Sequence, residues 1–430
     1  MATLGCKVNQ CESAWIAEAL TGGGMTVVPF EEEADCYIVN TCTVTERSDY
    51  QSRQLIRLAI RRNPAASILV TGCYAQRTPT EIARIPGVRI VAGNTEKESI
   101  PELVRQMAGM AGLQLRVGDI GQEKGFPRLG VTDFPEHTRA FLKIQDGCNA
   151  SCSYCIVPAA RGRSRSLPPE GVAEGIATLA GKGYREVVLT GIHLGAYGRD
   201  LVPPENLAAV IRRCIDERMV ERVRLSSIEP REVTDELITL MGSSGVVCRH
   251  LHIPLQSGDD GILATMGRDY DAAFFRDVVQ KVQTAIPGVA IGIDVMAGFP
   301  GETEAAFANT LHLVEAMSVA YLHVFPYSRR PGTPAAAMSG QVAESEKKRR
   351  TQILRRVAEE KRRAFEAQFI GEPLTVLVEG REDKSTGYPL GFSDNYIPIA
   401  VRGDTQPNWI VRVIPESYRN GRLIAEVIHD

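Results

Sequence analysis

Three cysteines lie close together in the segment DGCNASCSYCIVPAARGRSRS, residues 146–166. Cys148, Cys152 and Cys155 form a C-x3-C-x2-C pattern. An iron–sulfur cube has four iron corners, usually held by four thiolates, so three thiolates from one loop would leave one iron open to a small molecule. The alternative is a structural zinc site closed by a distant fourth ligand, because the segment contains no further Cys or His.

A second set of cysteines follows predicted strands in the first part of the chain. Cys6 ends the predicted strand at residues 2–5, Cys42 follows YIVNT, and Cys73 follows ILVTG. If these strands are parallel, all three thiols reach the carboxyl edge of one sheet, where ligands bind in such folds. Buried free cysteines are also common, so spacing alone leaves both interpretations open. Cys11 is a reserve candidate, whereas Cys36, Cys214 and Cys248 are expected to be core or incidental residues.

Composition is that of a soluble globular protein. The chain has 430 residues, 44% hydrophobic and 23% charged, which suffices for two or three domains. Apolar runs are too short for a membrane span, and the start, MATLGCKVNQ, lacks the apolar core of a secretory signal. A cytoplasmic location is therefore expected, with the ten cysteines as thiols or metal ligands. The net charge of −3 restricts RNA contact to local basic patches.

The elements that would position these cysteines fall into three regions, all within an α/β class plus a small all-β unit. Residues 1–112 predict an open parallel α/β domain, and residues 113–135 read as a Gly- and Pro-rich linker. Residues 136–365 repeat strand, loop and helix six times, which predicts a partial (βα)6 barrel with its chemistry at the strand ends. Residues 366–430 contain β-branched runs separated by turns, typical of a small β-barrel.

Several ordered motifs resemble one enzyme family. TLGCKVNQ, NTCTVT, TGCYAQ, GCNASCSYCIVP, SSIEP, PLQSG, DVMAGFPGET and FPYSRRPGTPA together resemble the radical S-adenosylmethionine methylthiotransferases, including a TRAM-like C-terminal barrel. The resemblance runs from residue 2 to the end. TLGCKVNQ is most similar to the branch that acts on threonylcarbamoyladenosine in tRNA, although that branch often has Tyr at the position of Cys11.

The resemblance implies two [4Fe–4S] clusters and S-adenosylmethionine as cofactors. Cys148, Cys152 and Cys155 would hold the cluster that cleaves S-adenosylmethionine and yields a radical that abstracts hydrogen from C2 of the adenine. Cys6, Cys42 and Cys73 would hold the cluster that delivers sulfur, and a second S-adenosylmethionine would supply the methyl group. The expected activity is methylthiolation of N6-threonylcarbamoyladenosine at position 37, next to the anticodon. The alternatives are isopentenyladenosine in tRNA and an aspartate of a ribosomal protein.

Other motif residues are candidates for the cofactor site. They are polar, aromatic or small residues at predicted strand ends: Tyr154, Gly191, Ser226, Ser227, Glu229, Gln256, Asp294, Gly298 and Pro300. Each could instead serve only the geometry of the strand end.

The sequence also suggests which residues contact RNA and which partners the protein has. Arg161, Arg163 and Arg165 could hold phosphates of the tRNA anticodon stem-loop, and the basic helix at residues 344–369 is a further candidate. The last 65 residues carry ten acidic and six basic side chains, so RNA binding there would need stacking on Tyr388, Phe392, Tyr396 or Trp409. The expected reductant is a protein such as flavodoxin or ferredoxin, and the chain is expected to be a monomer that contacts no membrane.

Overall fold

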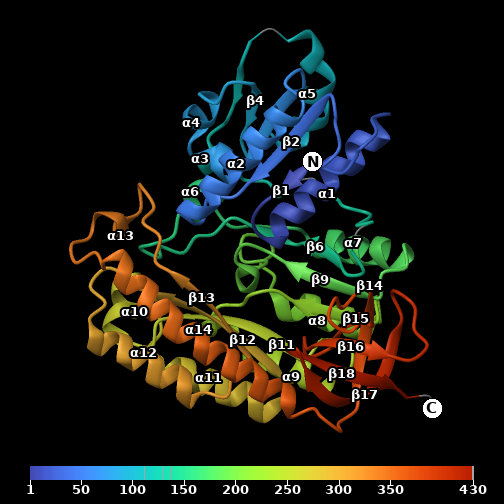
Figure 1. Ribbon diagram of the computed structural model, residues 1–430, viewed down its shortest axis with the longest axis vertical. Coiled ribbons are helices and arrows are strands. Elements are labelled where there is room, and N and C mark those ends of the chain that lie inside the picture. The colour runs from blue at the N-terminus through green and yellow to red at the C-terminus, as the bar shows by residue number, and fades with distance from the viewer. Residues whose placement is uncertain (111, 128, 136, 429–430) are drawn as a thin grey trace.

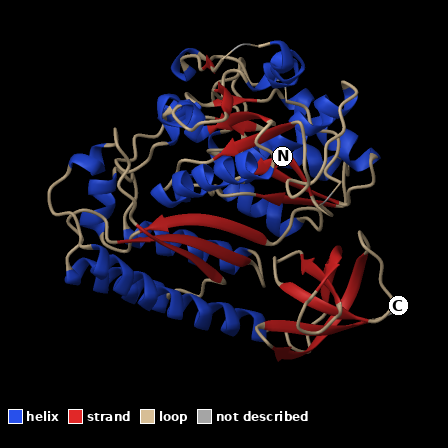
Figure 2. Ribbon diagram, turned by 45° about the horizontal axis from the view of Figure 1, so that its top comes forward, coloured by secondary structure: helices blue, strands red, loops and turns tan. Residues whose placement is uncertain are grey.

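The computed structural model describes residues 1–110, 112–127, 129–135 and 137–428. An α/β unit, a half-open barrel and a small β-barrel follow one another in the chain, and the long helix α14 (Glu344–Ala367) leads into the last of them (Figures 1 and 2). Within the described residues, no helix is both long and apolar enough to cross a lipid bilayer.

The N-terminal unit is a five-stranded parallel sheet in the order β1-β2-β3-β4-β5. Its strands are β1 (Ala2–Thr3), β2 (Cys36–Thr41), β3 (Ser67–Gly72), β4 (Val88–Ala92) and β5 (Gln114–Arg116). Its helices are α1 (Lys7–Gly22), α2 (Glu46–Arg62), α3 (Cys73–Arg77), α4 (Pro79–Ala83) and α5 (Ile100–Gln106). Because every strand runs the same way, the loops after β1, β2 and β3 meet at one edge.

The expected linker at residues 113–135 is more ordered than its composition suggests. Residues 114–116 form β5 and pair with β4, and Val131 and Phe134 are buried in the core of the middle unit. Tertiary pairing overrides the weak local signal of this Gly- and Pro-rich stretch. Residues 128 and 136, within the expected linker and at its boundary, lie outside the described residues.

The middle unit is a partial barrel of two three-stranded parallel sheets, β10-β9-β6 and β11-β12-β13. Its strands are β6 (Ala140–Lys143), β9 (Glu186–Thr190), β10 (Arg222–Leu225), β11 (His250–Gln256), β12 (Ala290–Ala297) and β13 (Tyr321–Pro326). Isolated bridges join the two sheets, Val223 to Val247 and Ser227 to His252. The predicted six βα units are therefore present and follow one another around the barrel in chain order.

Helices cover the outer face of this barrel, and a short hairpin extends from its first strand. The hairpin is β7 (Gln145–Asp146) with β8 (Arg165–Ser166). The helices of this unit are α6 (Val157–Arg161), α7 (Pro169–Gly181), α8 (Leu207–Asp216), α9 (Asp235–Ser243), α10 (Asp260–Met266), α11 (Ala272–Ala285), α12 (Glu304–Ala316), α13 (Pro334–Ala337) and α14. Of these, α6 packs against α3 of the N-terminal unit. One large apolar core lies between these helices and the strands.

The C-terminal unit is a closed five-stranded barrel that fits a TRAM domain. Its strands are β14 (Leu374–Glu382), β15 (Pro389–Ser393), β16 (Pro398–Arg402), β17 (Ile410–Arg419) and β18 (Arg422–Val427), in the order β14-β15-β16-β18-β17. It has a core of its own.

The small barrel docks on the middle barrel through the turn that follows β15. Arg224 donates hydrogen bonds to the carbonyl groups of Ser393 (3.1 Å) and Asp394 (3.0 Å). The Tyr396 ring lies 4.5 Å from the His250 ring, and the Arg139 guanidinium lies 4.5 Å above the Phe392 ring. Phe392 and Tyr396 therefore pack at the interface between the two barrels and are not free to stack on RNA bases.

Candidate active site and metal centres

The three cysteines of the 146–166 segment lie on one loop between β7 and α6. Burial raises the pKa of the Cys155 thiol to about 12, and the nearby Cys152 and Cys148 add to this shift. Backbone N–H groups of Ala150 and Val157 point at Cys148 Sγ (3.3 Å) and Cys155 Sγ (3.4 Å). The thiol of Cys155 therefore stays protonated at neutral pH until a metal ion displaces its proton.

Two cationic or ionisable side chains flank this loop. Arg268 Nη1 lies 3.2 Å from Cys152 Sγ, and His193 Nδ1 lies 3.3 Å from Cys148 Sγ. His193 also contacts Glu232 through Nε2. Positive charge beside thiolates stabilises a metal-bound anionic form, so the surroundings fit a thiolate-ligated cluster.

The second set of cysteines meets at the carboxyl edge of the N-terminal sheet. Cys6, Cys42 and Cys73 each follow the end of one parallel strand. A methyl group placed on Gly5, next to Cys6, would lie 3.3 Å from Cys42 Sγ. Burial raises the pKa of Cys42 to about 11, and the nearby thiols of Cys73 and Cys6 raise it further. The fold thus brings together three thiols, and the first and the last of them, Cys6 and Cys73, are more than 60 residues apart in the sequence.

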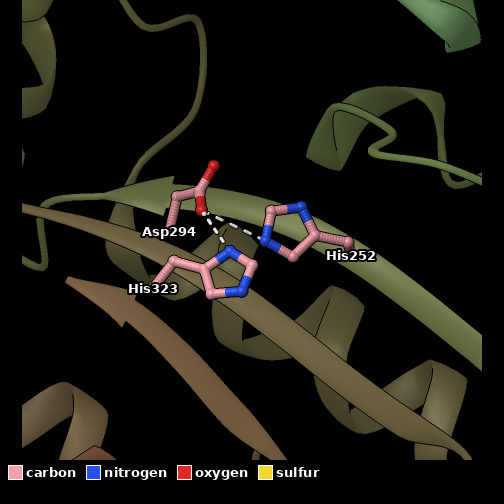
Figure 3. Close-up of side chains that lie close together, drawn as sticks. All are labelled: His252, Asp294 and His323. Atoms are coloured by element: carbon pink, nitrogen blue, oxygen red, sulfur yellow. Dashed lines mark ion pairs between the residues drawn. The ribbon is translucent and has the colours of Figure 1, made fainter. Parts of the chain in front are cut away.

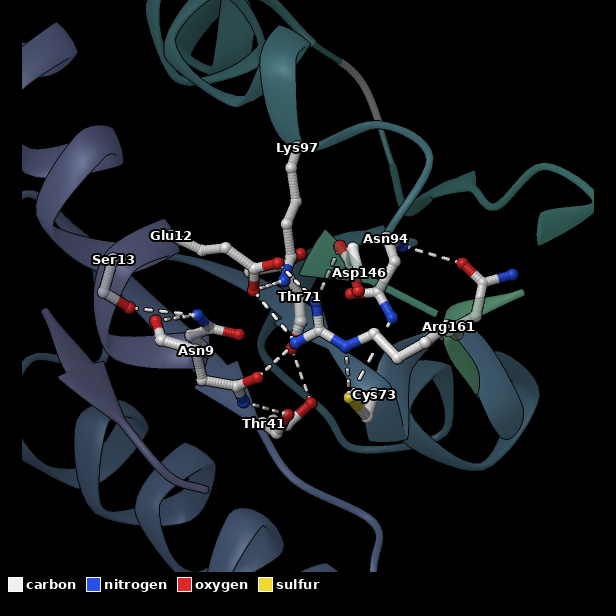
Figure 4. Close-up of polar contacts among 12 residues, drawn as sticks. Asn9, Glu12, Ser13, Thr41, Thr71, Cys73, Asn94, Lys97, Asp146 and Arg161 are labelled. Atoms are coloured by element: carbon white, nitrogen blue, oxygen red, sulfur yellow. Dashed lines mark hydrogen bonds and ion pairs between the residues drawn. The ribbon is translucent and has the colours of Figure 1, made fainter. Parts of the chain in front are cut away.

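A buried ionic network surrounds Cys73 (Figure 4). Arg161 donates from Nε to Cys73 Sγ at 3.2 Å. Its other nitrogens contact Asn9 and both carboxylate oxygens of Glu12. Lys97 also pairs with Glu12. Although burial opposes ionisation, the charges of Arg161, Lys97 and Lys143 hold the pKa of Glu12 well below its usual range.

This network contains a surplus of positive charge. Four basic side chains, Lys97, Lys143, Arg161 and Arg165, face the two carboxylates of Glu12 and Asp146. Burial lowers the pKa of Lys97 to about 8, with Glu12 opposing the shift, so this lysine is still mostly charged at pH 7. A buried surplus of cations requires an anion nearby, and metal-bound thiolates at Cys73 and its neighbours would supply one.

The prediction that Arg161 and Arg165 contact RNA is wrong. Arg161 is 1% exposed and Arg165 is 5% exposed, because both side chains turn inward, Arg165 donating to the Arg161 carbonyl (2.8 Å). Only Arg163 of the three is exposed. Arg161 and Arg165 turn toward the carboxylates of Glu12 and Asp146, which the composition of ARGRSR does not reveal.

Two of the expected cofactor residues present unpaired polar atoms. Ser226 Oγ and Gln256 Oε1 are buried and have no hydrogen-bond partner among the residues that the structure describes. Gln256 ends β11 with φ +68, in the left-handed region, next to a register shift in the β11–β12 pairing. Unsatisfied polar atoms and backbone strain are both features of ligand sites, so these residues fit a polar cofactor such as S-adenosylmethionine.

Three further candidates have protein partners. Ser227 Oγ lies 2.7 Å from His252 Nδ1. Glu229 pairs with Arg268, and burial raises its pKa despite that partner. Asp294 lies within β12, three residues before its end. Of the two serines and Glu229, only Ser226 has a buried polar atom without a hydrogen-bond partner among the described residues.

The remaining candidates have packing reasons for their residue types. Tyr154 meets Phe299 edge-on, with ring centroids 6.4 Å apart. A side chain at Gly191 would approach Gln145 Oε1 to 2.8 Å, and one at Gly298, where φ is +77, would approach Lys347 Cγ to 2.4 Å. Pro300 is buried in the same turn as Gly298. Packing alone thus accounts for the residue type at Gly191 and Gly298, and the cofactor contacts expected of these positions stay a prediction.

The other cysteines lie away from both thiol sets. Cys11 is buried where α1 packs on the middle barrel, and its thiol donates to the Phe141 carbonyl at 3.5 Å. Cys36 contacts Met107, Cys214 lies on the buried face of α8, and Cys248 is buried just before β11. Cys11 is therefore a packing residue at an interface between units.

Most basic residues of α14 are committed to ion pairs. Arg350 is buried against Glu302 (2.6 Å), Arg349 bridges Glu304 and Glu346, and Lys361 donates to two carbonyl groups. These charges bind the inward side of the helix to the barrel. Arg356 and Arg363 stay exposed, and their ion pairs among the described residues lie within the helix, so RNA contact by this helix stays a prediction. Sequence reasoning also missed His193, whose only signal was its position after a strand end, and Arg268, for which the sequence offers no signal.

Two protein-family descriptions match the chain. The first, Uncharacterized protein family UPF0004, covers residues 1–93, and the second, the Radical SAM superfamily, covers residues 142–314. Among solved structures, the radical S-adenosylmethionine methyltransferase TsrM from Kitasatospora setae aligns with a TM-score of 0.57 at 16% identity, over 76% of this chain and 72% of that one. This likeness shows the fold of the barrel and its neighbouring unit.

Full-length relatives are more specific. The threonylcarbamoyladenosine tRNA methylthiotransferase MtaB of Bacillus subtilis is 42% identical over 405 residues, 93% of this chain and 89% of that protein. The protein of the same name from Aquifex aeolicus is 37% identical over 96% and 98% of the two chains. The tRNA-2-methylthio-N(6)-dimethylallyladenosine synthase of Clostridium novyi is 36% identical over 88% and 85%. The chain therefore belongs to the radical S-adenosylmethionine tRNA methylthiotransferase family.

Proposed function

We propose that this chain inserts a methylthio group at C2 of N6-threonylcarbamoyladenosine at position 37 of tRNA. The observation that carries the proposal is the presence of two separate cysteine triads, one after β7 and one at the edge of the N-terminal sheet, in a chain 42% identical to a protein named for this activity. One triad alone would support cofactor cleavage without a place for sulfur delivery.

Cys148, Cys152 and Cys155 hold a [4Fe–4S] cluster in this proposal. Three thiolates leave one iron open, and the bound cluster supplies a low-potential electron to the sulfonium of S-adenosylmethionine. Arg268 and His193 hold the ligating sulfurs in place through their contacts with Cys152 and Cys148. Ser226 and Gln256 offer the unpaired polar atoms that orient the cofactor.

Cys6, Cys42 and Cys73 hold the second [4Fe–4S] cluster. Support comes from their meeting at one sheet edge and from the surplus positive charge around Arg161. Arg161 donates to Cys73 from a helix that begins two residues after Cys155. The same short segment therefore positions ligands or partners of both clusters, which keeps the two reaction centres in one fixed geometry.

The partners follow from the substrate. The tRNA anticodon stem-loop approaches the open side of the barrel, and Arg163, which is exposed on the segment after Cys155, serves as a phosphate contact. A reduced flavodoxin or ferredoxin supplies the electrons, and the enzyme acts as a cytoplasmic monomer. The second candidate substrate is dimethylallyladenosine in tRNA, favoured by the 36% identity to a synthase named for that nucleoside.

Anaerobic reconstitution followed by nucleoside mass spectrometry tests the proposal. The enzyme is supplied with S-adenosylmethionine, a reductant and sulfide, together with tRNA carrying either threonylcarbamoyladenosine or dimethylallyladenosine. The expected product is the 2-methylthio form of the first nucleoside. Product only from the second tRNA would assign the other branch, and cofactor cleavage with no thiolated nucleoside from either would overturn tRNA methylthiolation.

A further inference from the structure

The strands β11, β12 and β13 have one apolar and one polar face. Leu251, Ile253 and Leu255 of β11 are buried in the core beneath the helices, so the alternate residues face the inside of the barrel. Those inward residues are His250, His252 and Gln256 on β11, Asp294 on β12, and Tyr321 and His323 on β13. A polar inner face this deep indicates a polar ligand, because buried polar groups need partners.

Two of these residues, His252 and His323, converge on the carboxylate of a third, Asp294 (Figure 3). Asp294 Oδ1 lies 3.1 Å from His252 Nε2 and 3.4 Å from His323 Nδ1. Although burial opposes ionisation, the contacts with His252 and His323 lower the pKa of Asp294 to about 2. Ser227 holds the far nitrogen of His252 at 2.7 Å, so the ring cannot turn freely.

One atom of this group lacks a hydrogen-bond partner. His252 Nε2 is buried and does not meet the geometry of a hydrogen bond with any described residue, despite its closeness to Asp294. His323, by contrast, has a side chain that is 61% exposed on the inner face of the barrel. The group is therefore anchored on one side and accessible on the other, as a binding site for an incoming group would be.

Aromatic side chains close the barrel below the group. The Tyr321 ring lies across Gly292, where a methyl group would come within 2.0 Å of it, and Tyr321 Oη lies 2.8 Å from His250 Nε2. Tyr396 of the C-terminal barrel packs on His250 from beneath. Gln256 lies at the other end of β11, at the mouth of the barrel where the cofactor is proposed to bind (the cofactor mouth). His252, Asp294 and His323 thus lie between the cofactor mouth and an aromatic floor.

The chemistry of the threonylcarbamoyl group matches this layer. The group carries ureido N–H donors, a hydroxyl and a free carboxylate, whereas a dimethylallyl group is a hydrocarbon. An ionised carboxylate inside the barrel accepts hydrogen bonds from N–H and O–H groups, and an imidazole N–H donates to a carboxylate. A hydrocarbon in the same place would give the unpaired His252 Nε2 no polar partner, which costs binding free energy.

We propose that His252, Asp294 and His323 form the subsite for the polar N6 substituent of the target adenosine, with Asp294 accepting from its N–H or hydroxyl groups and His323 donating to its carboxylate. This inference rests on the proposed function and adds the residues that select the substrate.

Matched variants of the reconstituted full-length enzyme test it. Asp294→Asn is compared with Asp277→Asn on the exposed face of α11, and His323→Ala with His312→Ala on the exposed face of α12. The probes are one tRNA carrying threonylcarbamoyladenosine and the same tRNA with unmodified adenosine. The readouts are Kd for each tRNA, kcat and KM for thiolation, and 5′-deoxyadenosine formed without tRNA.

Both subsite variants should lose about 10- to 100-fold in affinity for the hypermodified tRNA, the loss expected for a hydrogen bond to a charged group. Affinity for the unmodified tRNA should not change in either variant, and tRNA-independent cofactor cleavage should not change in His323→Ala. His323→Gln retains a donor and should recover most of the affinity. Because His323 is largely exposed, its variants test the proposal even if Asp294→Asn fails to fold.

The outcomes separate this inference from the proposed function. Unchanged preference for the hypermodified tRNA in His323→Ala would overturn the subsite. Two imidazoles and a carboxylate also suit a divalent metal, so one Zn²⁺ retained per wild-type chain after desalting, and lost in His323→Ala, would overturn it as well. Failure of the wild-type enzyme to thiolate either tRNA, with cofactor cleavage intact, would instead overturn the proposed function.

Discussion

Arg161 Nε lies 3.2 Å from Cys73 Sγ, although the two residues are 88 positions apart in the sequence. Arg161 ends α6, the helix that follows the loop of Cys148, Cys152 and Cys155, and Cys73 begins α3 at the edge of the N-terminal sheet. One side chain therefore links the two thiol sets.

Replacing Arg161 by Met should empty the second cluster site and spare the first. Removing one partner of a buried ionic network costs about 3–5 kcal/mol, and it also removes the donor to Cys73. We expect iron content to fall by about half, one of two four-iron clusters, with 5′-deoxyadenosine still formed. Arg163→Met, two residues away but exposed, is the control and should keep full iron. Full iron in both variants would show that Arg161 does not support the cluster.

Replacing Cys6, Cys42 or Cys73 by Ala should give one shared phenotype. Each variant removes a ligand of the same proposed cluster, so sulfur insertion should stop while cofactor cleavage continues. Cys36→Ala and Cys214→Ala are the matched controls and should still thiolate tRNA. Cys11→Ala should lower stability by about 1 kcal/mol through lost packing and leave thiolation intact. Methylthiolated product from Cys42→Ala over many turnovers would contradict the two-cluster proposal.

Replacing Cys152 by Ala should abolish reductive cleavage of S-adenosylmethionine. Only three protein thiolates hold the proposed cluster, and Arg268, which contacts Cys152, also pairs with Glu229 in the cofactor mouth. The measurement is 5′-deoxyadenosine by chromatography, with Cys248→Ala as the control. Cleavage at the wild-type rate would refute the assignment of Cys152 as a ligand.

Replacing Arg163 by Gln should weaken tRNA binding. As an exposed cation on the segment after Cys155, it is expected to neutralise one phosphate, so the slope of log K against log salt should become shallower by about one unit. Lys182→Gln, an exposed lysine at the end of α7, is the control and should leave the slope unchanged. An unchanged slope in Arg163→Gln would remove this residue from the RNA interface.

Replacing Asp394 by Ala should loosen the C-terminal barrel. Asp394 pairs with Arg249 at 2.6 Å, and its loss should lower the free energy of unfolding by about 1–3 kcal/mol, as for a partly buried hydrogen bond to a charge. Thermal denaturation measures the loss, with Asp404→Ala, in an exposed turn, as the control. Equal stability of the two variants would show that this ion pair does not hold the barrel in place.

Local patterns in the sequence determined much of the architecture. The helices at residues 46–62 and 272–285 begin and end where their apolar periodicity predicts. Cys148, Cys152 and Cys155 lie within eight residues, so backbone connectivity alone keeps them together. Cys6, Cys42 and Cys73 could be predicted to meet because parallel strands place their carboxyl ends at one edge. In both cases the relevant distances depend on local geometry or on a general rule of topology.

Only the tertiary structure decided which polar side chains turn inward. Arg161 and Arg165 looked like surface residues, yet they are buried, because Glu12 and Asp146 from distant segments lie opposite them. Phe392 and Tyr396 looked free for RNA, yet they pack at a domain interface. His252, Asp294 and His323 alternate with apolar residues in the sequence, but their meeting depends on the register of three strands. Register, docking and charge pairing arise from contacts between segments far apart in the chain, and no local pattern encodes which partner each side chain will meet.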